Sequence, residues 1–262
     1  MRFNAFNRTA VQRRYTARMS ATAEHLFIKV RHGAPMAAAD NLRLVAGLGI
    51  QDDINAHGLS PRQILVTATS ELDALALQPG ALRENLVIAT DRPGDFQPGS
   101  CLISASGVEI RLTMYCEPCK QLLPLVADLA GLIGRRGILG VIVRSGQLLR
   151  GDALELIPGR YPALPDSVYQ KFLDFVPTIP RGRVVRYSDV ALAIGADNSF
   201  VRAIPGYIKR SLASGLPLHR IVSARGQLLA TIPHQAEMLM AEGVLSNGGV
   251  ELGTYLWQGE RF

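Results

Sequence analysis

The sequence predicts an α+β protein of two domains, a β-rich barrel followed by a helical domain with a winged-helix-like helix-turn-helix. Its 262 residues exceed the usual size of one domain, roughly 100–200 residues. Short runs rich in Val and Ile, separated by turn residues, continue to residue 157, and apolar residues at helical spacing follow residue 165. With 48% hydrophobic and 19% charged residues, the chain can bury a core and differs from disordered proteins.

Seven segments are expected to be strands, and their regular spacing is typical of a mostly antiparallel barrel. Helices are predicted over residues 71–76 and 119–133, between strands. The predicted strands are residues 25–30, 63–67, 85–89, 101–103, 108–112, 138–143 and 153–157.

Changes in composition predict the domain boundaries. Residues 1–23 hold five Arg and no acidic residue, without a periodic apolar pattern, so we expect a disordered or spurious extension. A transit peptide and a true start at Met19 are the alternatives. The barrel domain is assigned to residues 24–158 and the helical domain to residues 166–262. The proline-rich residues 159–165 between them are expected to be a linker.

Two helices joined by a tight turn are expected in the second domain, after a first helix over residues 168–176. Ser188 is a suitable N-cap for a helix over residues 190–194, which Gly195 can end. The next helix is expected to begin near Ser199 and to be kinked by Pro205. This arrangement is typical of a helix-turn-helix.

The charge distribution indicates a polyanionic partner for the second domain. Residues 159–225 hold 10 basic and 4 acidic side chains, a local charge of +6 that equals the net charge of the whole chain. A basic block within a folded segment favours double-stranded DNA as the partner, and a solvated basic face is the alternative.

The cysteines and the hydropathy pattern favour a cytoplasmic protein without a membrane partner. The chain has three cysteines, an odd number that argues against a secreted disulfide scaffold. No charge-free apolar run reaches the ~18 residues needed to span a bilayer.

Three separated segments of the second domain resemble one known family. Residues 179–191 (IPRGRVVRYSDVA), 201–204 (VRAI) and 217–222 (PLHRIV) are similar, in order and spacing, to the DNA-binding domain of O6-alkylguanine-DNA alkyltransferases. In that family the motif Pro-Cys-His-Arg supplies the cysteine that accepts the alkyl group. Here Leu218 occupies the cysteine position, and no cysteine follows Cys119, so a thiolate acceptor is missing. The chain thus resembles the alkyltransferase-like proteins, and we expect it not to be an active methyltransferase.

The resemblance implies roles for individual residues in DNA binding. Arg202 matches the arginine that enters the duplex stack when a nucleotide is flipped, and Tyr187 matches the tyrosine that turns the target phosphate. An ordinary phosphate contact or a surface position is the alternative for Arg202. Further DNA contacts are expected from Lys209, Arg210 and Arg220.

A lesion pocket for O6-alkylguanine is expected at Leu218 and His219. His219 and Glu242 match the relay that activates the cysteine in true transferases. Without a nucleophile, we expect this pair to be structural.

The first domain resembles MOSC domains, named for the C-terminal part of molybdenum cofactor sulfurases. The resemblance rests on residues 49–65, 79–88 and 116–119 (CEPC), and Asp52 stands where a glycine is common. It implies a β-rich barrel that binds molybdenum cofactor (molybdopterin), with a cysteine as metal ligand or persulfide carrier. Pyridoxal phosphate binding is a further property that the resemblance implies.

Cys119 is the expected metal ligand, because a soft thiolate suits a sulfur-coordinated molybdenum centre and a helix N-terminus would favour the thiolate. A redox pair with Cys116, half a zinc site and inert buried thiols are the alternatives. Zinc is not expected, because no further ligands occur at matching spacing. The residues expected to hold the cofactor are Arg62, Asn85 and Asp53, with a salt bridge and a turn cap as alternatives.

Two functions remain open from the sequence. In one, the first domain is a molybdenum-dependent oxidoreductase or a sulfurtransferase, fused to a domain that senses O6-alkylguanine. In the other, the first domain is degenerate and the chain is a noncatalytic DNA-lesion sensor for DNA repair. Repair proteins are the partners expected for a sensor, and a redox partner is expected for an oxidoreductase.

Overall fold

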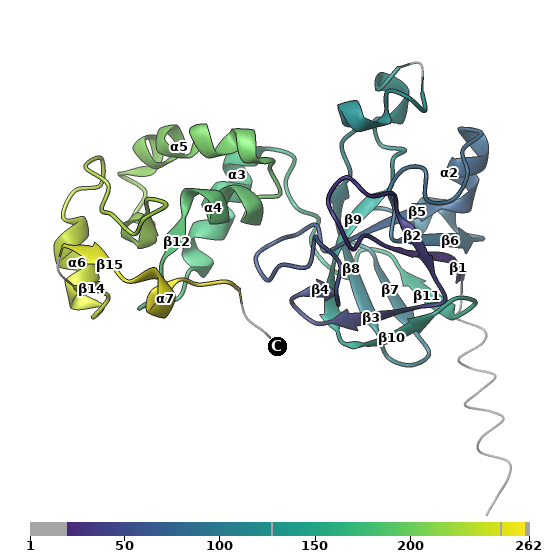
Figure 1. The fold of residues 1–262 in the computed structure, drawn as a ribbon, viewed down its shortest axis with the longest axis horizontal. Helices are drawn as coiled ribbons and strands as arrows, with labels where there is room; N and C mark the ends of the chain where they lie inside the picture. Colours follow the sequence, from purple (N-terminus) through teal and green to yellow (C-terminus); the bar gives the residue numbers. More distant parts are fainter. Residues whose placement is uncertain (1–19, 127, 247, 260–262) are drawn as a thin grey trace, which may run out of the picture. The chain divides into compact units, whose positions relative to one another are not determined.

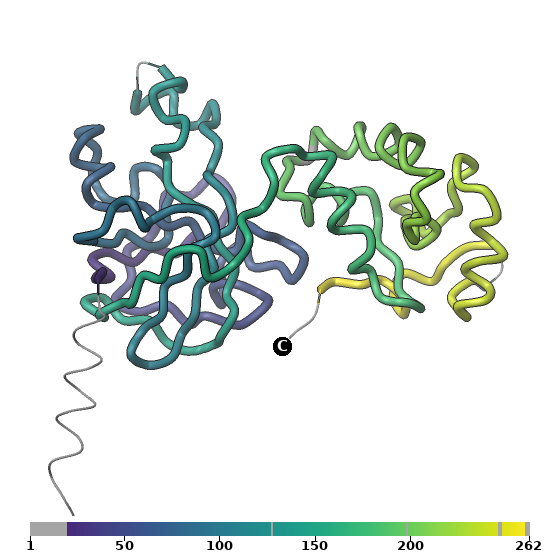
Figure 2. The backbone as a smooth tube through the Cα atoms, turned by 180° about the vertical axis from the view of Figure 1, so that it is seen from behind, coloured from purple at the N-terminus to yellow at the C-terminus, as the bar shows by residue number. Residues whose placement is uncertain are grey.

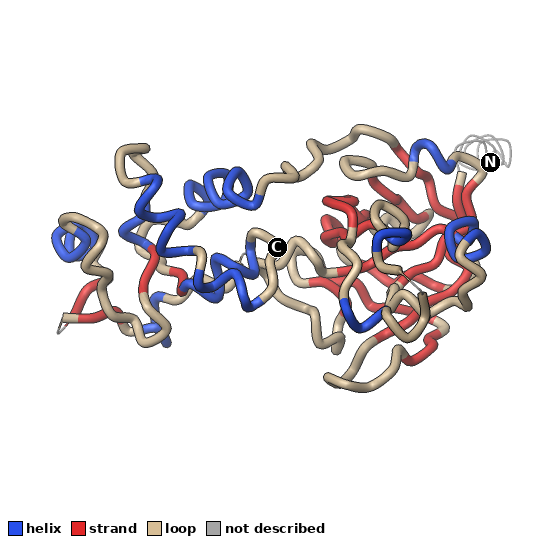
Figure 3. The backbone as a smooth tube through the Cα atoms, turned by 90° about the horizontal axis from the view of Figure 1, so that it is seen from above, coloured by secondary structure: helices blue, strands red, loops and turns tan. Residues whose placement is uncertain are grey.

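The computed structural model describes residues 20–126, 128–246 and 248–259, which form two compact units (Figure 1). The first unit comprises residues 20–56 and 62–164, and the second comprises residues 57–61 and 165–259. Strands dominate the first unit and helices the second, so the α+β fold class is confirmed (Figure 3). Most of the expected N-terminal extension lies outside the described residues, but its last residues already belong to the first strand.

Seven strands close a barrel in the first unit. Their order is β11-β7-β8-β9-β5-β6-β1, and β1 pairs again with β11. Every pair around the ring is antiparallel except β5 with β6, so the expected mostly antiparallel barrel is confirmed. The strands are β1 (Ala21–Ile28), β5 (Ile64–Ala68), β6 (Leu86–Thr90), β7 (Cys101–Ser104), β8 (Glu109–Tyr115), β9 (Ile138–Arg144) and β11 (Ala153–Ile157).

Four short strands outside the ring are absent from the sequence prediction. β2 (Ala37–Ala39) pairs with β1, while β10 (Gly146–Leu149), β3 (Asn41–Val45) and β4 (Gly49–Ile50) form a separate three-stranded sheet. Only alternate residues of β3 are buried, so its apolar signal is weaker than that of β5, which is buried throughout.

The long helix predicted over residues 119–133 is wrong. Two single 3₁₀ turns, η2 (Lys120–Leu122) and η3 (Ala130–Leu132), lie in the excursion between β8 and β9, which is drawn in teal in Figure 2. Pro124 lacks a backbone N–H and obstructs the preceding turn of a helix, which explains the break. The other helix of the barrel region is present as α2 (Thr69–Ala74), and a third 3₁₀ turn is η1 (Pro93–Asp95).

The second unit packs its helices around a core that includes Phe172, Ile204 and Ile208, all fully buried. None of the described helices has both the length and the apolar character needed to cross a membrane. Its elements are α3 (Val168–Phe175), η4 (Val176–Thr178), β12 (Val185–Arg186), α4 (Tyr187–Ala193), η5 (Asn198–Arg202), α5 (Ile204–Ser211), η6 (Leu218–Arg220), β13 (Ile221–Val222), α6 (Gln235–Ala241), β14 (Leu245–Ser246), β15 (Gly249–Val250) and α7 (Leu252–Tyr255).

The helix-turn-helix differs from the prediction at two helix starts. Helix α4 is capped at Arg186, not at Ser188, because the Asp189 carboxylate in its first turn accepts a hydrogen bond from the Arg186 N–H at 2.8 Å. After the turn at Gly195, the chain forms the 3₁₀ turn η5 before α5 begins. Pro205 therefore lies in the first turn of α5, where no N–H is needed, and the expected kink is absent.

The proline-rich segment expected to be a linker is held on the first unit. Glu109, whose side chain is 2% exposed, accepts hydrogen bonds from Arg160 Nε at 2.7 Å and from the Tyr161 hydroxyl at 2.6 Å. Leu164 N also donates to the Thr113 carbonyl at 3.1 Å. Burial would raise the pKa of Glu109, but the bonds from Tyr161 and Arg160 and the charges of Arg160 and Arg144 lower it. Residues 159–164 are therefore an anchored strap.

We predict that Glu109→Gln releases this strap. The variant loses the charge on which two hydrogen bonds depend, so trypsin should cleave after Arg160 about tenfold faster or more. Peptide mass spectrometry over a digestion time course measures this rate. Glu71→Gln is the matched control, because Glu71 pairs with Arg135 while 39% exposed. Equal cleavage rates in the native chain, Glu109→Gln and Glu71→Gln would show that Glu109 does not hold the strap.

Candidate functional site

A short parallel strand pair joins the predicted DNA-binding segments of the second unit. Val185 of β12 pairs with Ile221 of β13, and Arg186 pairs with Val222. Tyr187 directly follows β12 and Arg220 directly precedes β13, so motifs that are far apart in the sequence become neighbours.

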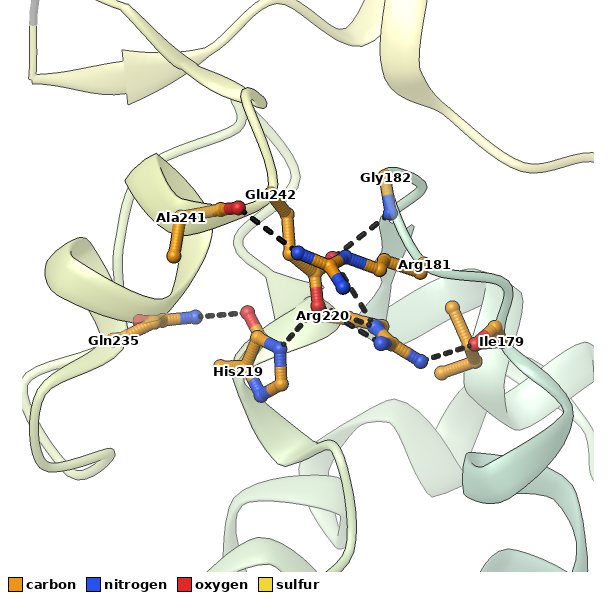
Figure 4. A network of polar contacts seen from close by, with 8 residues as sticks. All are labelled: Ile179, Arg181, Gly182, His219, Arg220, Gln235, Ala241 and Glu242. Carbon is orange, nitrogen blue, oxygen red and sulfur yellow. Dashed lines mark hydrogen bonds and ion pairs between the residues drawn. The ribbon is translucent and has the colours of Figure 1, made fainter.

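The buried carboxylate of Glu242 is the centre of a polar network beside this pair (Figure 4). It accepts hydrogen bonds from His219 Nε2 at 2.9 Å, Arg220 Nη2 at 2.8 Å and Gly182 N at 2.9 Å. Burial would raise the pKa of Glu242, but these bonds and the charge of Arg220 bring it to about 2. Gly182 has φ +76°, a conformation that glycine adopts without strain.

His219 is fixed on both sides by this network. Its side chain is 7% exposed, and its carbonyl oxygen accepts a hydrogen bond from Gln235 Nε2 at 3.0 Å. The same amide donates to the Ile221 carbonyl at 2.8 Å. The relay pair that the resemblance implies, His219 and Glu242, is therefore in direct contact.

Leu218 and Arg220 have roles inside the unit. Leu218 is 4% exposed and packs in the core with Phe172 and Ile204. Arg220, which we expect from the sequence to contact DNA, instead pairs with Glu242 and donates to the Ile179 carbonyl at 2.7 Å. With its side chain 15% exposed, we assign Arg220 to the network.

Other predicted DNA contacts are accessible. Arg202, Lys209 and Arg210 are exposed, and the Arg210 guanidinium lies 3.9 Å from the ring centroid of Tyr169. Arg202 ends η5, whose start is capped by the Asp197 carboxylate. Within the described residues, none forms a hydrogen bond or ion pair with the Arg202 side chain.

Tyr187, at the start of α4, is half-buried, and burial raises the pKa of its phenol. It keeps part of its surface exposed, as a phosphate contact requires.

Ion pairs reduce the basic surface that the sequence suggests. Three of the ten basic residues in 159–225 are neutralised by carboxylates, because Arg160, Arg186 and Arg220 pair with Glu109, Asp189 and Glu242. The positive surface of the second unit therefore depends on its exposed cations, including Arg202, Lys209, Arg210 and Arg225.

Two of the predicted cofactor ligands in the first unit are already committed to structural bonds. Asp53 accepts from Lys29 N at 2.9 Å and from Asn55 N at 2.8 Å. Asn85 Nδ2 donates to Asp53 at 3.1 Å, and its Oδ1 accepts from Leu65 N at 3.0 Å. These bonds fix the chain segments that carry the two side chains.

The three cysteines differ in exposure. Cys119 is partly exposed, whereas Cys101 and Cys116 are buried. Burial raises the pKa of Cys101 to about 11, and it also raises that of Cys116 against the opposing charges of Arg136 and Arg62, the latter hydrogen-bonded to the thiol. Cys119 precedes a single 3₁₀ turn, so the helix N-terminus expected to favour its thiolate is not formed.

Two cations at a cavity of the first unit are missing from the sequence prediction. Lys29 and Arg83 line a cavity of about 260 Å³ together with Gln121. Burial and the charge of Arg83 lower the pKa of Lys29, whereas Asp53 and Cys119 act in the opposite direction, which places Lys29 near the thiol. Arg83 stands inside the segment 79–88 that resembles MOSC domains, but Lys29 is a lone cation at a strand end and gave no signal.

The cations Lys29 and Arg83 suit an anionic ligand, and the Cys119 thiol suits a soft metal. In the described part of the chain, no three His, Cys, Asp or Glu side chains gather at a metal site. A metal held by Cys119 must therefore bring other ligands with it, as a sulfur-coordinated molybdenum centre does.

Comparison with known proteins gives one family match and several relatives. Residues 167–244 match the family described as 6-O-methylguanine DNA methyltransferase, DNA binding domain. The DNA base-flipping protein of Escherichia coli K12 is 37% identical over 98 residues, which cover 35% of this chain and 75% of that protein.

Two solved structures are also similar. S. pombe Atl1, solved in complex with damaged DNA containing O6-carboxymethylguanine, is 28% identical and matches 36% of this chain and 96% of that one, with a TM-score of 0.32. The YuaD protein of Bacillus subtilis is 23% identical and matches 53% of this chain and 96% of that one, with a TM-score of 0.45.

We predict that Glu242→Gln destabilises the second unit in a pH-dependent way. The pKa of Glu242 falls from 4.5 to about 2 on folding, so its contribution is present above pH 4.5 and is lost as the pH falls toward 2. The free energy of unfolding should drop by on the order of 2 kcal/mol at pH 7. Urea titrations followed by fluorescence of the single tryptophan, Trp257, measure it at several pH values.

Glu237→Gln is the control, because Glu237 is 72% exposed. A gap between Glu242→Gln and the native chain that stays constant from pH 7 to pH 3 would contradict the assigned role of the carboxylate.

Proposed function

Through residues 167–244 the chain belongs to the family of the 6-O-methylguanine DNA methyltransferase DNA-binding domain, and we propose that this unit binds duplex DNA and recognises O6-alkylguanine without accepting the alkyl group. The observation that carries the proposal is Leu218. Its hydrocarbon side chain stands beside an intact His219–Glu242 pair, so the surroundings of the acceptor are retained while the nucleophile is lost.

Nucleotide flipping is the proposed mode of recognition, supported by the 37% identity to a DNA base-flipping protein. Extruding a nucleotide costs a few kcal/mol, and a planar guanidinium that fills the vacated stack offsets part of this cost. Arg202, exposed at the end of a capped turn, is the residue we propose for this role. Tyr187 turns the phosphate of the flipped nucleotide, and Leu218 and His219 belong to the pocket that receives its base.

Lys209 and Arg210 contact phosphates and set the position of the unit on the duplex. Without alkyl transfer the lesion stays in place, and the unit acts as a noncatalytic lesion sensor. Other repair proteins then recognise the complex of this unit with the damaged DNA.

Arg202→Ala should weaken lesion binding more than plain duplex binding. The loss is expected to be about tenfold or more for duplexes with O6-methylguanine, because the side chain acts only when the base is flipped. The double variant Lys209→Ala, Arg210→Ala should lower both affinities nearly in parallel and reduce the salt dependence of binding. Fluorescence anisotropy with modified and unmodified duplexes at two salt concentrations checks this. If the native chain binds both duplexes equally, lesion sensing is refuted.

A second proposed function belongs to the first unit, and the cavity that Lys29 and Arg83 line favours it. Cys119 would hold the metal of a molybdenum cofactor or carry a persulfide, and Lys29 and Arg83 would hold the phosphate of the cofactor. The bound cofactor would supply oxygen-atom or sulfur transfer. A degenerate first unit is the alternative.

Cys119→Ser should abolish bound molybdenum and pterin in protein purified from a host that makes the cofactor. Cys101→Ser is the matched control and should retain both, because Cys101 is buried in the barrel. Metal analysis and pterin fluorescence give the two readouts. Equal cofactor content in the two variants would remove the metal-ligand role of Cys119.

A further inference from the structure

The exposed side chain of Arg210 is stacked on an aromatic ring. Its guanidinium carbon lies 3.9 Å from the centroid of the Tyr169 ring, so the last turn of α5 contacts the first turn of α3 here. A cation at this distance is attracted by the negative face of the ring. The stack therefore favours one position of a side chain that would otherwise move freely in solvent.

The Tyr169 ring is itself fixed by the core of the second unit. Its hydroxyl shares a hydrogen bond of 2.9 Å with Ser211 Oγ, and Ser211 is 2% exposed. The ring centroid lies 6.3 Å from that of the fully buried Phe172 and 5.3 Å from that of Tyr207. The core thus determines where the Arg210 guanidinium lies.

No carboxylate of the described residues competes for Arg210. None of these residues forms an ion pair or a hydrogen bond with its side chain, whereas Arg186 and Arg220 are both held by carboxylates. A guanidinium that stacks through its face keeps the N–H groups at its edge, and this planar fork matches two oxygens of one phosphate. The neighbouring exposed cation, Lys209, is a point charge without such a fork.

We propose that Tyr169 is a positioning residue for DNA binding, which holds the Arg210 guanidinium so that its N–H fork grips one backbone phosphate of the duplex. Holding the side chain in place before binding reduces the conformational entropy that is lost when the contact forms. This inference rests on the proposed binding of duplex DNA by the second unit, and it does not depend on lesion recognition.

The test measures the affinity of the full-length chain for an unmodified duplex by fluorescence anisotropy at several salt concentrations. Tyr169→Leu should weaken binding about fivefold, as expected when one long side chain loses its preorganisation. Tyr169→Phe keeps the ring and should restore most of the native affinity. Arg210→Lys keeps the charge but loses the planar fork, so the affinity should fall about fivefold while its salt dependence stays that of the native chain.

A double-mutant cycle separates positioning from a general loss of structure. Arg210→Ala should lower the salt dependence by about one phosphate contact. Adding Tyr169→Leu to this variant should weaken binding no further, because Tyr169 acts only through Arg210. Tyr255→Leu is the matched control and should keep the native affinity, because Tyr255 is half-buried in the same unit and no guanidinium of the described residues lies on its ring.

If Tyr169→Leu weakens binding equally with and without the Arg210 side chain, or no more than Tyr255→Leu does, Tyr169 is only structural and the inference fails while DNA binding stands. Should Tyr169→Leu not fold, Arg210→Lys decides. A fivefold loss at unchanged salt dependence supports the inference, and native affinity overturns it. If the native chain binds no duplex, both proposals fail.

Discussion

The second unit depends on one buried carboxylate. Glu242 joins three segments that are distant in the sequence, because it accepts from Gly182 before β12, from His219 and Arg220 in η6, and itself ends α6. A carboxylate with so many donors stays charged. These segments of the unit thus owe their relative positions to this one side chain.

The first unit uses the same device at Glu109. Its nearly buried carboxylate forms ion pairs with Arg144 and Arg160, as that of Glu242 does with Arg220. A count of charges along the sequence would treat all three arginines as unpaired. Charge along the sequence therefore overestimates the cationic surface, since a tertiary contact decides which guanidinium faces the solvent. The cations that remain exposed are fewer, and they include Arg202, Lys209 and Arg210 on and next to α5.

The sequence predicts the seven barrel strands from short runs rich in Val, Ile and Leu, although only β5 is buried throughout and β11 is buried at alternate residues. It misses β3 and β10, where only part of each strand is buried. The functional residues are also hard to predict, because contacts between distant segments decide what each side chain binds. Asp53, Asn85 and Arg220 are residue types that hold ligands, but backbone groups and side chains from other segments occupy them here. Lys29 becomes recognisable only when the fold brings Arg83 and Cys119 near it.

The closure of the barrel ties its folding to the order of synthesis. Ala21 and Thr22 of the first strand pair with Leu154 and Ala153 of the last. A nascent chain cannot complete the ring until the final strand has left the ribosome, and until then β1 and β7 each present an unpaired edge. Pairings between such distant residues also make folding slow. The open intermediate is thus the species most exposed to aggregation and to chaperones, and a chain cut before residue 153 would remain in that state permanently.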